Sequence, residues 1–89
     1  MTTRKRVRAT GRVQGVFFRD SVRRAADAAG VAGSAANMPD GSVEVVLEGP
    51  EEAVERLVEL CRRGPGHAEV ARLDVADEAP EGLRGFSVQ

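Results

Sequence analysis

Hydrophobic and polar positions alternate in some parts of the chain and recur every three to four residues in others. Alternation predicts strands over residues 5–10, 42–49 and 67–77. The small residues 32–37 and the short segment 84–88 are further predicted strands. Apolar residues spaced three and four apart predict helices over about 20–29 and 50–63. The predicted order is β-α-β-β-α-β with a short strand added. It favours an α+β, ferredoxin-like α/β sandwich, in which two helices cover one face of an antiparallel sheet of four to five strands.

Each predicted element has one side that suits a core. The residues expected to be buried on the first strand and the two helices are Val7, Ala9, Val22, Ala25, Ala26, Ala29, Val54, Leu57, Val58 and Cys61. Asp20 or Ser21 is suited to cap the first helix, and Gly30 is suited to end it.

Two local patterns describe the strand connections. MPDG, residues 38–41, predicts a tight turn that joins two strands into a hairpin. In the later strand the parity of the apolar positions changes between Val70 and Leu73, which predicts a β-bulge.

The composition is that of one folded domain spanning residues 1–89, with 42% apolar and 30% charged residues. The only cysteine, Cys61, leaves no internal disulfide, which suits a reducing compartment. No apolar run has the length of a membrane span, and residues 1–10 lack the apolar core of a signal peptide. These features predict a cytoplasmic protein without a membrane partner.

Charge is balanced overall but unevenly distributed. The formal net charge is −1, and six basic residues fall within the first 19 positions, whereas acidic residues dominate from Glu44 to Glu59. We interpret this as a solvated basic strand beside an acidic helix, with a nucleic-acid surface as the weaker alternative. RNA-binding sheets of this topology need aromatic residues on their central strands, which this chain lacks. Phe17 and Phe18 are better suited to a core or to a pocket wall.

Several common catalytic arrangements lack their residues. One histidine and one cysteine, His67 and Cys61, do not make a metal-ligand set. Cys61 falls on the buried side of the second helix, which argues against a Cys–His nucleophile pair, and His67 follows Gly-Pro-Gly, a context typical of surface loops. No Gly-Lys-Ser/Thr follows the glycines, so a Walker A loop is absent. We therefore expect neither a metal nor another cofactor.

The stretch GRVQGVFFRD, residues 11–20, has the features of an anion site. Gly11 and Gly15 let the backbone curl so that several N–H groups converge, and the next helix begins with N–H groups that lack intrahelical partners. Arg19 is unfavourable at the positive end of a helix dipole, but an oxyanion bound between them satisfies both. Simple strand-to-helix turns have similar spacing, so the pattern alone leaves that alternative open.

GRVQGVFFR closely resembles the signature loop of the acylphosphatase family. Residues 33–49, GSAANMPDGSVEVVLEG, resemble its second signature, in which spaced glycine, asparagine and glycine residues precede an alternating strand. GPEEAVERLVELCRRGPGHAEV resembles the family's second helix and following strand. The resemblance covers nearly the whole chain and implies the same ferredoxin-like sandwich.

The resemblance also implies an activity, the hydrolysis of the carboxyl-phosphate bond of small acyl phosphates to a carboxylate and inorganic phosphate. Acetyl, carbamoyl and 1,3-bisphosphoglyceryl phosphate are such substrates. Arg19 would grip the phosphoryl oxygens, and Asn37 would orient the attacking water. The backbone amides of the phosphate-binding loop would cradle the phosphate; this loop comprises Gln14, Gly15, Val16, Phe17, Phe18 and Arg19. The mechanism needs neither a metal nor a covalent intermediate, and we expect a monomer.

The chain departs from the family pattern at three places. Ser34 stands where an aromatic residue is usual, Ala36 where a larger or basic residue is usual, and Gly66 where the family often has the second proline of Gly-Pro-Pro. The main rival is a non-catalytic ferredoxin-like module that binds a small anion or another protein. A stand-alone relative of the acylphosphatase-like domain of hydrogenase-maturation carbamoyltransferases is a further alternative, against which the absence of zinc-finger cysteines counts.

Overall fold

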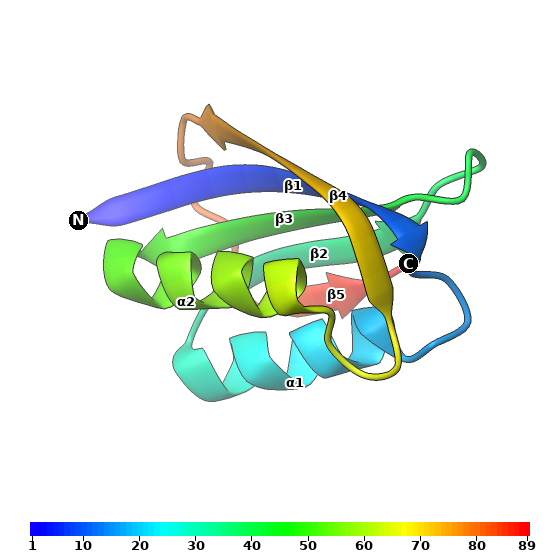
Figure 1. The fold of residues 1–89 in the computed structure, drawn as a ribbon. Helices are drawn as coiled ribbons and strands as arrows, with labels where there is room; N and C mark the ends of the chain where they lie inside the picture. The colour runs from blue at the N-terminus through cyan, green and yellow to red at the C-terminus, as the bar shows by residue number, and fades with distance from the viewer.

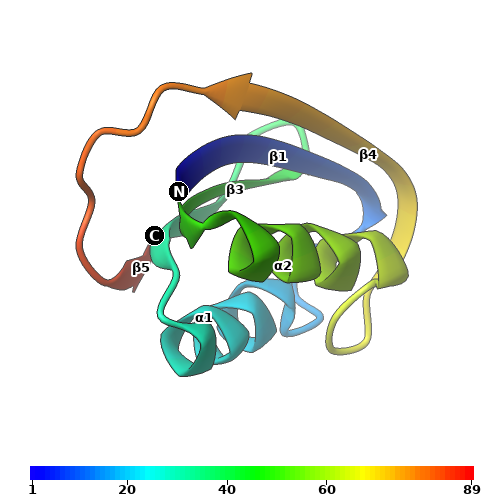
Figure 2. The ribbon, with the colours of Figure 1, turned by 90° about the vertical axis from the view of Figure 1, so that its left-hand side faces the viewer.

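The computed structural model describes residues 1–89. Its elements are β1 (Thr2–Arg12), α1 (Phe18–Ala29), β2 (Ala32–Asn37), β3 (Val43–Pro50), α2 (Glu51–Arg63), β4 (Glu69–Glu78) and β5 (Phe86–Val88). The strands form one five-stranded sheet in the order β4-β1-β3-β2-β5, and both helices lie on one face of it (Figure 1 and Figure 2). The predicted α+β ferredoxin-like fold is confirmed.

The sheet is mixed, whereas the sequence predicted an antiparallel one. β1 pairs antiparallel with β3 and β4, and β2 pairs antiparallel with β3, but β5 pairs parallel with β2. Residues 79–85 lead from β4 at one edge of the sheet to β5 at the other edge (Figure 2). This long crossing sets the direction of β5, which the side-chain pattern of a short strand does not encode.

The core lies between the helices and the sheet face that they cover. Val7 and Ala9 of β1 are fully buried, as are Val54 and Cys61 of α2, in agreement with the predicted faces. The buried hydrophobic cluster has 17 members, of which Phe18 is the only aromatic residue. The core is therefore built largely from small aliphatic side chains, as the scarcity of aromatic residues requires.

Helix α1 begins at Phe18, earlier than predicted, and the expected capping by Asp20 or Ser21 is wrong. The N-cap residue is Phe17, which has φ 65° and makes no side-chain cap. Phe18 is 1% exposed, so its burial in the core extends the helix back into the loop. Gly30 ends the helix with φ 69°, as predicted.

The predicted hairpin and bulge are both present. Met38 and Ser42 close the β2–β3 turn through a backbone hydrogen bond of 2.8 Å. Where β1 pairs with β4, Thr10 lies opposite Arg72 and Gly11 opposite Val70, so one extra residue of β4 is accommodated between them. This register shift is the bulge that the change of parity predicted.

The interpretation of a solvated basic strand holds for Arg8 and Arg12, whose side chains are exposed, but it is wrong for Arg4 and Arg6. Arg4 is 5% exposed and contacts the carboxylates of Glu48 at 3.3 Å and Glu78 at 2.8 Å. Arg6 contacts Glu78 and Glu44, each at 2.6 Å. The cations of β1 thus pair across the open face of the sheet with anions of β3 and β4. This pairing gives no support to a nucleic-acid surface.

Glu48 attaches the crossing segment to the sheet. Its carboxylate is 4% exposed and accepts backbone hydrogen bonds from Glu81, Gly82 and Leu83 at 2.8 to 2.9 Å. These donors, first that of Glu81, together with Arg4, hold the pKa of the Glu48 carboxyl below its ordinary value. The segment leads directly into β5, so Glu48 helps to place the C-terminal strand beside β2.

Candidate active site

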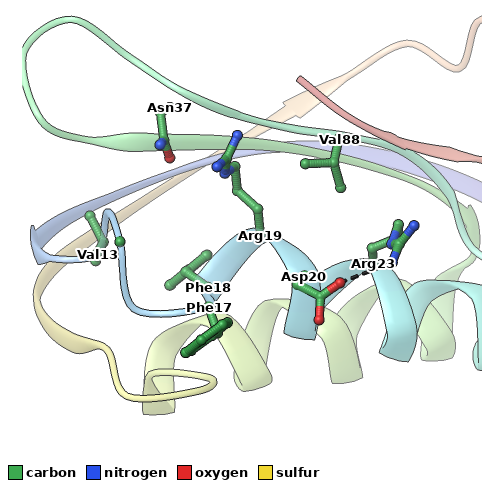
Figure 3. A pocket seen from close by; sticks show the side chains of 9 residues that line it. Val13, Phe17, Phe18, Arg19, Asp20, Arg23, Asn37 and Val88 are labelled. Carbon is green, nitrogen blue, oxygen red and sulfur yellow. Dashed lines mark hydrogen bonds and ion pairs between the residues drawn. The ribbon is translucent and has the colours of Figure 1, made fainter.

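A cavity of about 430 Å³ opens where β1 leads into α1. Its volume lies in the range of small-molecule sites. Four chain segments meet there: the β1–α1 loop, the first turns of α1, the end of β2 and β5 (Figure 3). The lining residues are Val13, Gly15, Phe17, Phe18, Arg19, Asp20, Arg23, Asn37 and Val88.

The loop and the helix start present a run of unpaired backbone donors. None of the N–H groups of residues 14–19 donates a hydrogen bond within the protein, and the first backbone donor of this region is Ser21, which bonds to Phe17 at 3.0 Å. The initial N–H groups of any helix lack intrahelical acceptors, and here the preceding loop adds more. Such a run of donors suits an anion with several oxygens.

The loop is attached to the neighbouring hairpin through Gln14. Its side-chain Nε2 donates to the carbonyl oxygens of Met38 at 2.8 Å and Ser42 at 3.0 Å. The hairpin turn is itself held by Asp40, whose Oδ1 accepts from the backbone N–H of Ser42 at 2.9 Å. The Gln14 side chain therefore braces the loop against the end of β2, and it does not line the cavity.

The two phenylalanines have different surroundings. Phe18 is buried in the core, whereas Phe17 is 66% exposed and borders the cavity. Phe17 is also the only non-glycine residue with a positive φ, in a backbone conformation that L-residues disfavour. Its ring meets that of His67 edge to face, with 6.0 Å between centroids. Phe18 thus has the predicted role of a core residue, and Phe17 that of a pocket wall.

Arg19 and Asn37 come together at the cavity. Arg19 extends from the first turn of α1 and Asn37 from the end of β2, and Figure 3 shows their side chains on the same side of the cavity. The guanidinium of Arg19 donates to the backbone oxygen of Gln89 at 2.5 Å. Gln89 is in turn held by β2, because its N–H donates to Ala35 at 2.9 Å.

Four lining residues were not among the predicted site residues: Val13, Asp20, Arg23 and Val88. The spacing of Arg23, four residues after Arg19, could have placed it on the same side of the helix. No sequence spacing could have placed Val88 at the cavity, because its position depends on the parallel pairing of β5 with β2.

The other reactive side chains lie elsewhere. Cys61 is fully buried, and burial raises the pKa of its thiol to about 12, so it is a core residue as expected. His67 is exposed on the connection between α2 and β4. No three His, Cys, Asp or Glu side chains gather as a metal-binding group. Neither helix is long and apolar enough to span a bilayer.

Comparison with known proteins identifies the family of this chain. The family model described as Acylphosphatase matches residues 5–88. The acylphosphatase of Gloeobacter violaceus is 56% identical over 78 residues, 88% of this chain and 84% of its own length. That of Rubrobacter xylanophilus is 53% identical over 89 residues, 99% of this chain and 81% of its own. The crystal structure of acylphosphatase from Bacillus subtilis superimposes with a TM-score of 0.92 at 38% identity, covering 100% of this chain and 99% of that one. The chain belongs to the acylphosphatase family, and its activity is that of an acylphosphatase, EC 3.6.1.7.

Proposed function

We propose that the phosphoryl group of an acyl phosphate binds against the backbone N–H groups of residues 14–19 and the side chain of Arg19. The observation that carries this proposal is the run of six unpaired N–H groups in a segment of which Gly15, Phe17, Phe18 and Arg19 line the cavity. Hydrogen bonds from several fixed donors stabilise the charge that spreads over the equatorial oxygens in the transition state. The planar guanidinium of Arg19 adds two parallel donors and a permanent charge.

Asn37 is assigned to the attacking water. Its amide oxygen can accept a hydrogen bond from water, although the amide is not a base. Water held in line with the departing carboxylate converts an encounter in solution into a positioned attack. The leaving carboxylate has a conjugate acid with a pKa of roughly 4 to 5, by analogy with glutamate, so it departs without a general acid. The phosphoryl oxygens can take the proton of the water, and no covalent intermediate is required.

The proposed substrate is a small acyl phosphate, and the products are a carboxylate and inorganic phosphate. Residues 1–89 contribute to one sheet and one core, which supports a single catalytic domain. The reaction as proposed uses no cofactor. A monomeric state and a cytoplasmic location stay predictions.

The decisive experiment measures turnover of benzoyl phosphate together with inhibition by inorganic phosphate. Arg19→Lys keeps the charge but loses the paired donors, so the inhibition constant and the turnover number should both worsen. Asn37→Ala should lower the turnover number on the order of 100-fold and leave phosphate inhibition nearly unchanged. Arg24→Lys is a matched control, because Arg24 is 76% exposed on the same helix and does not line the cavity.

Circular dichroism must first show that the three variants are folded. If Asn37→Ala turns over normally, or loses phosphate binding as severely as Arg19→Lys, the assignment of roles is wrong. Phosphate binding without any turnover by the native chain would favour the non-catalytic anion-binding alternative.

The anion site is tested separately by titrating the protein with inorganic phosphate and following backbone amide shifts by NMR. The amides of residues 15–19 should move first, because they belong to the run of unpaired donors at the helix start. Shifts confined to another surface would place the phosphate elsewhere.

A further inference from the structure

The cavity holds a second cation beyond Arg19. Arg23 lines it one helical turn further along α1 than Arg19 (Figure 3). Four residues of an α-helix rise about 6 Å along the helix axis. The cavity volume, about 430 Å³, exceeds what a phosphate group needs and leaves room for an acyl group beside Arg23.

The positive charge at this end of the cavity is only partly neutralised. Asp20 is the only acidic lining residue, and its carboxylate is shared by two arginines. Oδ1 accepts from Arg23 at 2.9 Å and Oδ2 accepts from Arg24 at 2.5 Å. Arg24, and then Arg23, hold the pKa of the Asp20 carboxyl below its ordinary value, so it stays ionised and still balances only one of the two cations.

The guanidinium of Arg23 has N–H donors available for a bound substrate. Its side chain is 47% exposed and makes this single ion pair, within its own helix. A guanidinium has five N–H donors, so one bond to Asp20 leaves most of them for a substrate.

We propose that Arg23 is a specificity-determining residue that favours acyl phosphates whose acyl group carries a second negative charge. This inference rests on the proposed function, because it requires the phosphoryl group to lie at residues 14–19. With a spacer of two carbon atoms, the five bonds from phosphorus to the distal carboxylate carbon span about 6 Å when extended, which matches the rise of the helix between Arg19 and Arg23. The preferred class is thus the mono-phosphorylated short dicarboxylate, with Arg19 at the phosphate end and Arg23 at the carboxylate end.

The test compares kcat/KM for succinyl phosphate and for butanoyl phosphate, which has the same number of carbon atoms and no second charge. Freshly prepared substrates are used, and the rate without enzyme is subtracted. Arg23→Gln should lower the succinyl-to-butanoyl ratio about fivefold, mainly through KM for succinyl phosphate, as expected for one partly exposed ion pair. Arg23→Lys should retain part of the preference, and Arg23→Glu should reverse it.

Arg24→Gln is the matched control, because Arg24 shares Asp20 but does not line the cavity. It should leave both rates as in the native chain. An unchanged ratio in folded Arg23→Gln, or an equal fall in Arg24→Gln, would overturn the assignment of Arg23. Failure of the native chain to hydrolyse either substrate would instead contradict the proposed function itself.

Discussion

The backbone N–H of His67 donates a hydrogen bond to the carbonyl oxygen of Val16 at 3.0 Å. The carbonyl and N–H of a trans peptide point in opposite directions, so this bond turns the N–H of Phe17 away from His67. Gly66 makes the approach possible: a Cβ there would lie 2.5 Å from the oxygen of Val16 and 3.1 Å from that of Phe17. The α2–β4 connection thus orients a peptide of the proposed phosphate-binding loop.

Gly66→Ala should therefore reduce activity. The added methyl group must push the loop away from the α2–β4 connection, and small displacements of positioned groups cost on the order of 10-fold to 100-fold in kcat/KM. Gly30→Ala is the control, because Gly30 has a similar positive φ and no atom within 4 Å of the added Cβ. Both variants should lose about 1 kcal/mol of stability from the left-handed backbone, but only Gly66→Ala should lose activity. Full activity in folded Gly66→Ala would show that this contact does not position the loop.

Cys61→Ala should lower stability by about 1 kcal/mol and leave kcat unchanged. Cys61 is fully buried in the core, so the substitution leaves a small cavity, and the residue does not line the active-site cavity. Burial raises the pKa of the thiol to about 12, so a thiol reagent should react with the folded protein far more slowly than with the unfolded one. Thermal melts and turnover numbers check the first expectation. An inactive variant with native melting behaviour would contradict it.

The protein should lose stability in acid between about pH 4.5 and pH 2. Arg6 first, and then Arg4, lower the pKa of the Glu78 carboxyl from 4.5 to about 2. A carboxyl whose pKa is lowered by folding stabilises the native state fully above its unfolded pKa, and this contribution disappears as pH falls towards the folded value. Urea unfolding across this range should therefore show a smaller acid dependence in Glu78→Gln than in the native chain. Glu52→Gln, at an exposed position of α2, should keep the native dependence. If the native chain and Glu78→Gln lose stability equally as pH falls, the Glu78 carboxyl is not the source of the acid dependence.

Chelation should leave turnover unchanged. In the proposed reaction, charge on the phosphoryl oxygens is stabilised by backbone donors and Arg19, and a free carboxylate leaves without acid assistance. Activity is measured after dialysis against EDTA and again after adding magnesium or zinc. A loss of activity that one of these ions restores would contradict the proposed mechanism.

The sequence alone determined the elements and the sides that they bury. Val7 and Ala9 are buried on either side of the exposed Arg8, and Val54 and Cys61 recur at helical spacing, so local periodicity reports which side of each element faces the core. It also located the glycine-bracketed loop, because glycine and the adjacent helix start are local features. Arg19 was assigned to this loop from its position at the helix start, and the resemblance of residues 33–49 to the second acylphosphatase signature supplied Asn37; the fold then brought both residues to one cavity.

The tertiary structure decided which distant residues meet. Nothing local marks Glu48 as the buried anchor of residues 81–83, Val88 as part of the cavity wall, or Gly66 as the position that must lack a Cβ for His67 to reach Val16. The start of α1 also depended on the core, because the burial of Phe18 outweighed the capping preference of Asp20. These features arise from pairing across the sheet and from packing between segments far apart in the chain. The free energy of such contacts depends on which partner is present, and side-chain periodicity within one element does not contain that information.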